Sequence, residues 1–253
     1  MSETHTILVN ILIAMENLID CKTFSPGAIY CVGKNYPEHA REMHLLEGIT
    51  SDIIHDDNVE PIIFMKPPTA IETAGVIIMP EFEGRPLSGN LQYEAEIVLL
   101  VGKSSDGCSI VDALNYIEGF GVGLDMTLRD VQLAAKKIGN PWLKSKGFRK
   151  SALISDFVPF NGTVFPNDLN VSLEVNGALV QEGRVSEMLH APAELIHYLS
   201  YIYGLRRGDL VFTGTPAGVG RVFSGDLLCA VLSMTENSVP CSNELVRLQA
   251  EVV

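Results

Sequence analysis

Short apolar runs bounded by turn-forming residues recur along most of the chain, and this pattern constrains its fold most strongly. Each run has the length of a β-strand, and Gly, Pro, Asn or Asp stand near its ends, where regular structure usually stops. Asn176-Gly177 lies between one such run and an alternating segment, 178–182, and predicts a β-hairpin with a type I′ turn, because both central residues of that turn need positive φ. We expect strands at residues 7–15, 28–32, 61–65, 76–79, 97–101, 119–124, 171–175, 209–213 and 227–232.

Helical periodicity is confined to a few segments. One helix is predicted for residues 128–138, with Lys136-Lys137 in its last turn and Gly139 after it, and a second for residues 193–203, followed by Gly204. A shorter helix is predicted for residues 37–43, with Pro37 in its first turn. Residues 44–60 are rich in acids and have little apolar pattern, which predicts a mobile surface loop and a candidate lid. Because we find no repeat, low-complexity tract or charged linker, we expect a single β-rich α+β domain over residues 1–253.

Charge and apolar content exclude several classes of partner. The formal net charge is −13, so nucleic acid and anionic membrane surfaces should be repelled. No apolar run reaches the ~18 residues of a membrane-spanning helix. Five cysteines without a C-x-x-C pair favour free thiols in a reducing compartment, so we expect a soluble, cytoplasmic protein. A small anionic ligand would then need local positive charge from a metal or from placed basic residues.

Two carboxylates are predicted to share one face of a strand. Glu94 and Glu96 alternate in the segment 91–100, which would place their Cα atoms about 6.6 Å apart on that face. Next to an apolar run, two acids repel one another and lose solvation unless a cation lies between them, and a hard divalent ion is the simplest candidate. The alternative is a solvent-facing edge strand whose acids are merely hydrated.

A third carboxylate follows the small-residue strand 119–124. Asp125 could be the N-cap of the next helix, or a metal ligand at the end of the strand. Together with Glu94 and Glu96 it would form a three-carboxylate site of the kind that Mg²⁺ or Mn²⁺ prefers. The glycines at 119, 121 and 123 do not fit a dinucleotide-binding G-x-G-x-x-G motif.

Two other segments could take part in chemistry. His39 and Glu42 are three residues apart in the 37–43 helix, so the carboxylate could hold the imidazole as part of a general base; the alternative is an exposed pair without a role. The loop 213–220 begins Thr-Gly-Thr-Pro, and its backbone N–H groups could bind an anion or could simply form a tight turn.

Taken together, several motifs resemble the fumarylacetoacetate hydrolase family, in its short acylpyruvase and oxaloacetate decarboxylase-like branch. The resemblance runs from about residue 28 to residue 230. The motifs are CVGKNYPEHAREM (31–43), FMKP (64–67), YEAE (93–96), LDMTLRDVQ (124–132), NPW (140–142), KGF (146–148) and TGTPAGVG (213–220).

This resemblance implies a fold, a site and a reaction. The fold would be the family's mixed β-sandwich roll, usually a homodimer, with Mg²⁺ or Mn²⁺ held by the three carboxylates. The implied catalytic residues are His39, Glu42 and Lys146, and the implied substrate-binding residues are Arg129, Gln132 and Thr215. The segment 44–60, a lid in relatives, is longer here, and its acids could disfavour dianionic substrates unless Lys144 and Arg149 offset them.

The implied reaction is divalent-metal-dependent hydrolysis of the C–C bond of short acylpyruvates through the enolate of pyruvate, with oxaloacetate decarboxylation as a further activity. One alternative is a 2-hydroxyhepta-2,4-diene-1,7-dioate isomerase or decarboxylase of aromatic catabolism. The other is a metal-binding protein that keeps the fold without catalysis. The resemblance leaves the physiological substrate and the native metal open.

Overall fold

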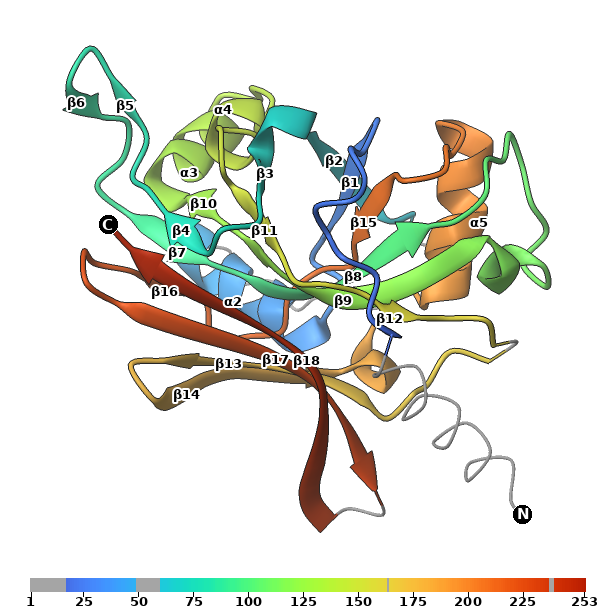
Figure 1. Cartoon of the computed structure of the whole chain (residues 1–253). Helices are drawn as coiled ribbons and strands as arrows, with labels where there is room; N and C mark the ends of the chain where they lie inside the picture. Colours follow the sequence, from blue (N-terminus) through green and yellow to red (C-terminus); the bar gives the residue numbers. More distant parts are fainter. Residues whose placement is uncertain (1–16, 49–59, 163, 237–238) are drawn as a thin grey trace.

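The computed structural model describes residues 17–48, 60–162, 164–236 and 239–253 (Figure 1). The strand expected at 7–15 and most of the expected 44–60 loop lie outside these residues. Within them, strands dominate and helices are few, which confirms the predicted β-rich α+β class.

The largest sheet has eight strands and carries the functional residues described below. Its order is β2-β1-β15-β8-β9-β11-β3, with β12 also paired to β9. β1 and β15 are parallel, whereas β15-β8-β9-β11 are antiparallel neighbours. The bounds are β1 (Ile29–Gly33), β2 (Ile62–Lys66), β3 (Ile71–Glu72), β8 (Ala95–Val101), β9 (Ile117–Asp125), β11 (Ala152–Ile154), β12 (Val158–Pro159) and β15 (Leu210–Phe212).

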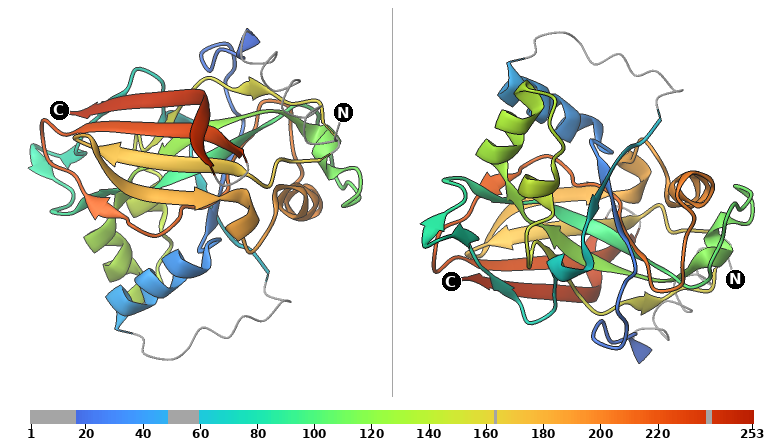
Figure 2. Two further views of the ribbon diagram at one scale, coloured as in Figure 1. Left: turned by 90° about the horizontal axis from the view of Figure 1, so that it is seen from below. Right: turned by 90° about the horizontal axis from the view of Figure 1, so that it is seen from above.

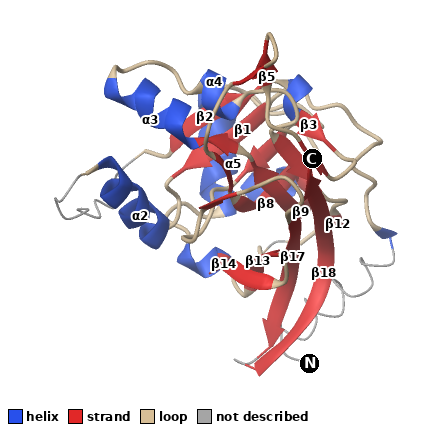
Figure 3. Ribbon diagram, turned by 90° about the vertical axis from the view of Figure 1, so that its left-hand side faces the viewer, coloured by secondary structure: helices blue, strands red, loops and turns tan. Residues whose placement is uncertain are grey.

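A second sheet of five strands lies against the first (Figure 1). Its order is β14-β13-β17-β18-β4, and its long strands β17 and β18 curve along one side of the molecule (Figure 3). The predicted hairpin is confirmed, because β13 pairs with β14 and both Asn176 and Gly177 have positive φ. The bounds are β4 (Val76–Ile77), β13 (Leu169–Val175), β14 (Ala178–Arg184), β17 (Leu227–Glu236) and β18 (Val239–Val252).

Apolar side chains cover both faces of β8, which explains why its sequence is continuously hydrophobic. Ile97 and Leu99 contribute to the main core between the two large sheets, while Val98 and Leu100 pack in a second cluster on the opposite face. The neighbouring glycines of β9 have a packing role: a Cβ on Gly123 would lie 2.7 Å from atoms of Phe212 and Val98. These glycines therefore allow close packing of the sheet.

Two small sheets and the helices complete the described fold. One sheet has the order β10-β7-β16, and the other pairs β5 with β6. The bounds are β5 (Glu81–Phe82), β6 (Arg85–Pro86), β7 (Leu91–Tyr93), β10 (Thr127–Leu128), β16 (Gly220–Arg221), α2 (Pro37–Glu47), α3 (Arg129–Lys137), α4 (Leu143–Lys146), α5 (Pro192–Ile202), η2 (Pro68–Ala70), η3 (Ala113–Tyr116) and η4 (Val185–Glu187). Among the described residues, no helix has the length and apolarity needed to cross a membrane.

The helix α2 differs from its predicted extent. It continues four residues beyond Met43 and ends at Glu47, with Gly48 in the left-handed conformation as its C-cap. Residues 44–47 are thus helical, and the prediction of a loop from residue 44 was wrong for them. The periodicity was weak there because Leu45 and Leu46 are exposed. The helices α2 and α3 lie on the same side of the molecule (Figure 2), and the Lys136–Glu47 ion pair links their C-terminal ends.

Candidate active site

Three buried carboxylates meet where the three-stranded sheet joins the eight-stranded sheet. Glu94 lies between β7 and β8, Glu96 is in β8, and Asp125 ends β9. One oxygen from each lies within 4.8 Å of the others, and the three residues are at most 3% exposed. The hydrated edge-strand alternative was therefore wrong. So was the N-cap alternative, because Leu128 is the N-cap of α3.

Local backbone structure explains how these side chains converge. The strand is not continuous, since it breaks at Glu94, and the Asp125 N–H donates to the Glu94 carbonyl at 2.8 Å. Glu96 pairs in register with Gly123, whose missing side chain leaves the β9 backbone close to β8. The break and the pairing bring acids that are far apart in sequence to one point.

Three buried basic side chains surround the carboxylates. Arg129 Nη2 pairs with Glu94 Oε1, and Lys146 Nζ contacts Glu94 Oε2 and lies 2.8 Å from Asp125 Oδ2. Lys66 Nζ lies 2.7 Å from Asp125 Oδ1. Lys66 was quoted in a motif but was not predicted as a site residue. Nothing in the sequence showed that this strand residue points into the protein beside Asp125.

The electrostatic environment separates the two glutamates. Although burial opposes ionisation, Lys146 and Arg129 hold the pKa of Glu94 well below its usual value. Burial, together with Asp125 and Glu94, raises the pKa of Glu96 well above its usual value. The pKa of Lys146 is raised by Asp125 and Glu94 despite its burial, so this ammonium can donate a proton but is a poor base at neutral pH.

The carboxylate cluster fits a divalent cation. Lys66 donates to the oxygens of Ser151, Lys146 and Met126, and Asp125 Oδ1 is left, among the described residues, without a donor in hydrogen-bond geometry. A buried oxygen in this state is suited to bind a metal. The donors are all hard carboxylate oxygens, which favours Mg²⁺ or Mn²⁺ over softer ions.

His39 and Glu42 form the predicted pair on α2. His39 Nδ1 lies 3.2 Å from Glu42 Oε2. The imidazole is buried and lines the same cleft as Glu94 and Glu96. Since Glu42 engages Nδ1, Nε2 is the ring nitrogen that remains for chemistry in the cleft. The alternative of an exposed helical pair was therefore wrong for His39.

The 213–220 loop binds two of the protein's own carboxylates. The Gly214 N–H donates to Glu96 Oε2 at 2.7 Å, and the Gly218 N–H lies 3.2 Å from each oxygen of Glu42. Thr215 Oγ donates to the Ala95 carbonyl at 2.8 Å and accepts from Gln181. The loop thus orients both a candidate metal ligand and the partner of His39.

The predicted substrate-binding residues line the same narrow cleft. Gln132 Oε1 accepts from Arg129 Nη1 at 2.6 Å, which fixes the guanidinium beside Glu94, and Thr215 lies nearby in the wall. Their contact with substrate stays a prediction. Lys144 and Arg149 are exposed and do not line this cleft, so they do not supply its positive charge as expected. Two unpredicted lysines, Lys34 and Lys136, line it instead.

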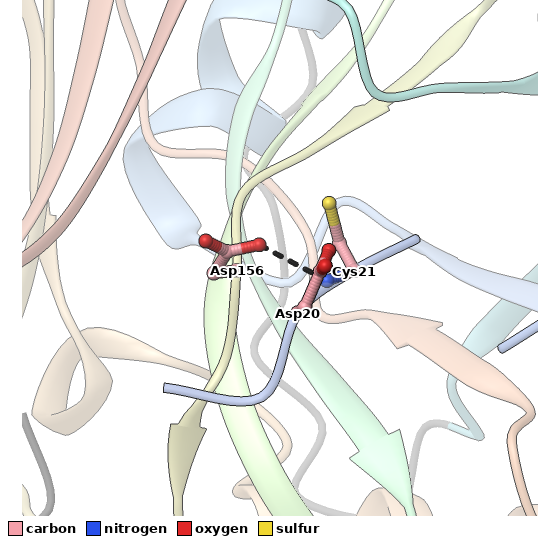
Figure 4. A group of neighbouring side chains, drawn as sticks. All are labelled: Asp20, Cys21 and Asp156. Carbon is pink, nitrogen blue, oxygen red and sulfur yellow. Dashed lines mark hydrogen bonds between the residues drawn. The ribbon is translucent and has the colours of Figure 1, made fainter. Parts of the chain in front are cut away.

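A second group of potential metal ligands is less suitable. Asp20, Cys21 and Asp156 come close together near β12 (Figure 4), but Asp20 is exposed and Asp156 accepts the backbone N–H of Cys21 at 3.0 Å. Burial and Asp156 raise the pKa of the Cys21 thiol to about 12. The protonated thiol is a weak ligand, so these residues are better explained as a stabilised turn.

A β-rich fold with three buried carboxylates, a histidine–glutamate pair and buried basic residues is the arrangement expected of a metal-dependent enzyme. The family model described as fumarylacetoacetate (FAA) hydrolase C-terminal matches residues 28–252. The chain belongs to the fumarylacetoacetate hydrolase family, as its motifs predicted.

Individual relatives resemble the chain over most of their length. The mouse protein named "Oxaloacetate tautomerase FAHD1, mitochondrial" is 39% identical over 78% of this chain and 83% of its own. Oxaloacetate tautomerase YcgM of Escherichia coli is 38% identical over 79% and 85%. A crystal structure of fumarylpyruvate hydrolase from Pseudomonas aeruginosa in complex with Mn²⁺ and pyruvate superimposes with a TM-score of 0.72 at 32% identity, covering 90% of each chain.

Proposed function

We propose that this chain is a divalent-metal-dependent enzyme that hydrolyses the C–C bond of short acylpyruvates. The observation that carries the proposal is the His39–Glu42 pair facing the same cleft as the three carboxylates. A general base beside a site for a 2-oxo acid is what hydrolysis requires. The crystal structure from Pseudomonas aeruginosa, which holds Mn²⁺ and pyruvate, gives support from a related hydrolase.

The charges of the site favour a reaction that builds up negative charge. With Glu96 ionised, as a metal ligand must be, Glu94, Glu96 and Asp125 carry three formal negative charges. Lys66, Lys146 and Arg129 carry three positive ones and balance them. These three carboxylates would hold a divalent cation, which would supply Lewis-acid stabilisation of negative charge on a 2-oxo acid.

The protein's own side chains account for the proton transfers. His39, oriented by Glu42, takes a proton from water, and the resulting hydroxide adds to the distal carbonyl of the acylpyruvate. The C–C bond then breaks and releases a carboxylic acid and the pyruvate enolate. Lys146 is suited to return a proton to the enolate carbon, because its ammonium is held in the protonated form by Asp125 and Glu94.

A second candidate reaction is the keto–enol tautomerisation of oxaloacetate. It is favoured by the mouse and Escherichia coli relatives, which carry that activity in their names. The reaction needs one proton removed and one returned, without water, and His39 and Lys146 offer that pair of groups. Decarboxylation of oxaloacetate would form the pyruvate enolate that the hydrolysis also forms.

Product analysis tests these proposals. Chelator-treated protein is given acetylpyruvate, enol-oxaloacetate or a 2-hydroxy-diene dioate, with and without Mg²⁺ or Mn²⁺, and each product is followed separately. Metal-dependent formation of acetate and pyruvate from acetylpyruvate supports hydrolysis. Ketonisation of oxaloacetate without acetylpyruvate cleavage would replace hydrolysis by tautomerisation, and turnover of the diene dioate alone would indicate an isomerase.

A variant tests the proposed role of His39 as the general base. His39→Ala should lower acetylpyruvate cleavage by ~10²–10⁴-fold, the usual contribution of a general base, while Mn²⁺ binding measured by calorimetry is retained. Cleavage at the parent rate in this variant would contradict the role of His39. Replacing His197, which bonds the Cys108 carbonyl away from the cleft, gives a matched control.

A further inference from the structure

Two lysines lie together in the wall of the cleft. Lys34 follows β1, and Lys136 is in the last turn of α3, so residues about 100 positions apart meet there. Both line the same cleft as Glu94 and Arg129. Neither has a part in the proton transfers proposed above.

The carboxylate of Glu47 bridges these lysines. Lys136 Nζ lies 2.5 Å from Glu47 Oε1, and Lys34 Nζ lies 3.8 Å from Glu47 Oε2. The three side chains are only 16–21% exposed. Glu47 is the last residue of α2, and its contact with Lys136 joins this end of α2 to the last turn of α3. The arrangement is a site for one carboxylate, filled by a carboxylate of the protein itself.

Several features show that the lysine pair is held in place. Lys34 has φ of 58°, a left-handed conformation that is uncommon for a residue other than glycine, asparagine or aspartate. Burial lowers the pKa of Lys34, and the neighbouring Lys136 adds to this lowering. Lys136 Nζ also lies 4.7 Å from the centre of the Trp142 ring. Two like charges kept close together need an anion between them.

The cleft is too narrow to accept a substrate with every side chain in place. Its free space is about 20 Å³, roughly what one water molecule needs. A 2-oxo acid of five carbons is several times larger, so side chains that line or close the cleft must move when it enters. Release of Glu47 would free the ammonium groups of the two lysines, which line the cleft.

We propose that Lys34 and Lys136 form a subsite for the distal carboxylate of dicarboxylic 2-oxo acids, and that Glu47 occupies this subsite until the substrate replaces it. This inference rests on the proposed function, in which the 2-oxo acid end lies at the carboxylate cluster. It names the substrate class more narrowly: diacids are preferred to monoacids of the same length. One carboxylate exchanges for another, so the number of negative charges that face the two lysines stays the same.

Binding to the Mn²⁺-loaded protein tests the subsite without relying on turnover. Calorimetry compares 2-oxoglutarate with 2-oxopentanoate, and 2-oxoadipate with 2-oxohexanoate, so that each pair differs only in the distal carboxylate. The parent should bind one of the diacids ~10-fold more tightly than its monoacid, as expected for a charge-assisted contact. Lys136→Met and Lys34→Met should each reduce that preference with little change for the monoacid. Glu47→Gln should increase it.

Lys137→Met is the matched control, because it removes the same charge from the adjacent residue, which does not line the cleft. Its diacid preference should equal that of the parent. Equal binding of diacids and monoacids at both lengths would overturn the subsite and leave the proposed function standing. An equal loss of both acids in Lys136→Met and Glu47→Gln would also overturn it, since the contact would then only tie α2 to α3. If the parent binds no 2-oxo acid at all, the proposed function fails and the subsite with it.

Discussion

Lys66 offers the sharpest test of how the buried charges are held. Its side chain is fully buried, lies 2.7 Å from Asp125 Oδ1, and donates to Ser151 Oγ at 2.9 Å. Lys66→Met keeps most of the volume but removes the charge and its donors. Removing one partner of a buried ion pair costs ~3–5 kcal/mol. Because Asp125 keeps Lys146 on its other oxygen, we expect the lower end, about 3 kcal/mol.

For a chain of this size, ~3 kcal/mol corresponds to a Tm decrease of roughly 6–12 °C, which calorimetry in chelator at neutral pH can measure. Lys150→Met is the control, since Lys150 is 38% exposed and its buried partner Glu72 keeps a hydrogen bond from the Ala74 N–H at 2.6 Å. The loss should therefore be smaller than for Lys66→Met. Added Mn²⁺ should stabilise Lys66→Met at least as much as the parent, because a cation compensates Asp125. A Lys66→Met protein that melts within ~3 °C of the parent would refute this account.

Other predictions follow from single features. Gly218→Ala should lower kcat, because its Cβ would lie 2.1 Å from the Val180 carbonyl oxygen and displace the N–H that contacts Glu42. The control Gly225→Ala has open space around it and should leave kcat unchanged. Glu96→Gln should weaken Mn²⁺ binding in calorimetry by ~10–100-fold or more, and unchanged affinity would exclude it as a ligand. With a pKa of about 12 instead of 9, Cys21 should be alkylated at pH 8 ~1,000-fold more slowly in the native than in the unfolded protein, as mass spectrometry can show. We also propose a homodimer, for which light scattering should give twice the 27.6 kDa chain mass and not the mass of a monomer.

The sequence predicted the strands well because their signals are local. The runs at 28–32, 61–65 and 97–101 correspond to β1, β2 and β8 within a few residues, and the Asn176-Gly177 turn has the expected backbone. In contrast, β18 was not predicted, although it has 14 residues. From Asn243 to Val252, exposed polar residues interrupt the buried apolar ones, so no compact apolar run marks the strand.

The candidate site was predicted where one sequence window or a family motif contains its residues. Glu94, Glu96 and Asp125 were expected to cluster, and they do. Lys34 and Lys136 could not be paired from sequence, because they meet only where the fold brings the ends of α2 and α3 together at Glu47. Periodicity describes one element at a time and says nothing of which elements become neighbours.

The break in the strand at Glu94 has a consequence for how the molecule opens. The three carboxylates lie at the joint between the β10-β7-β16 sheet and the eight-stranded sheet, where the backbone crosses from one sheet to the other at Glu94 and at Met126. An ion bound there would add a further link between the two sheets. Ion binding should therefore slow amide hydrogen exchange across β7, β10 and β16 together, as one cooperative unit, and not only at the ligands. The ion proposed for catalysis would then also stabilise the contact between the three-stranded and the eight-stranded sheet.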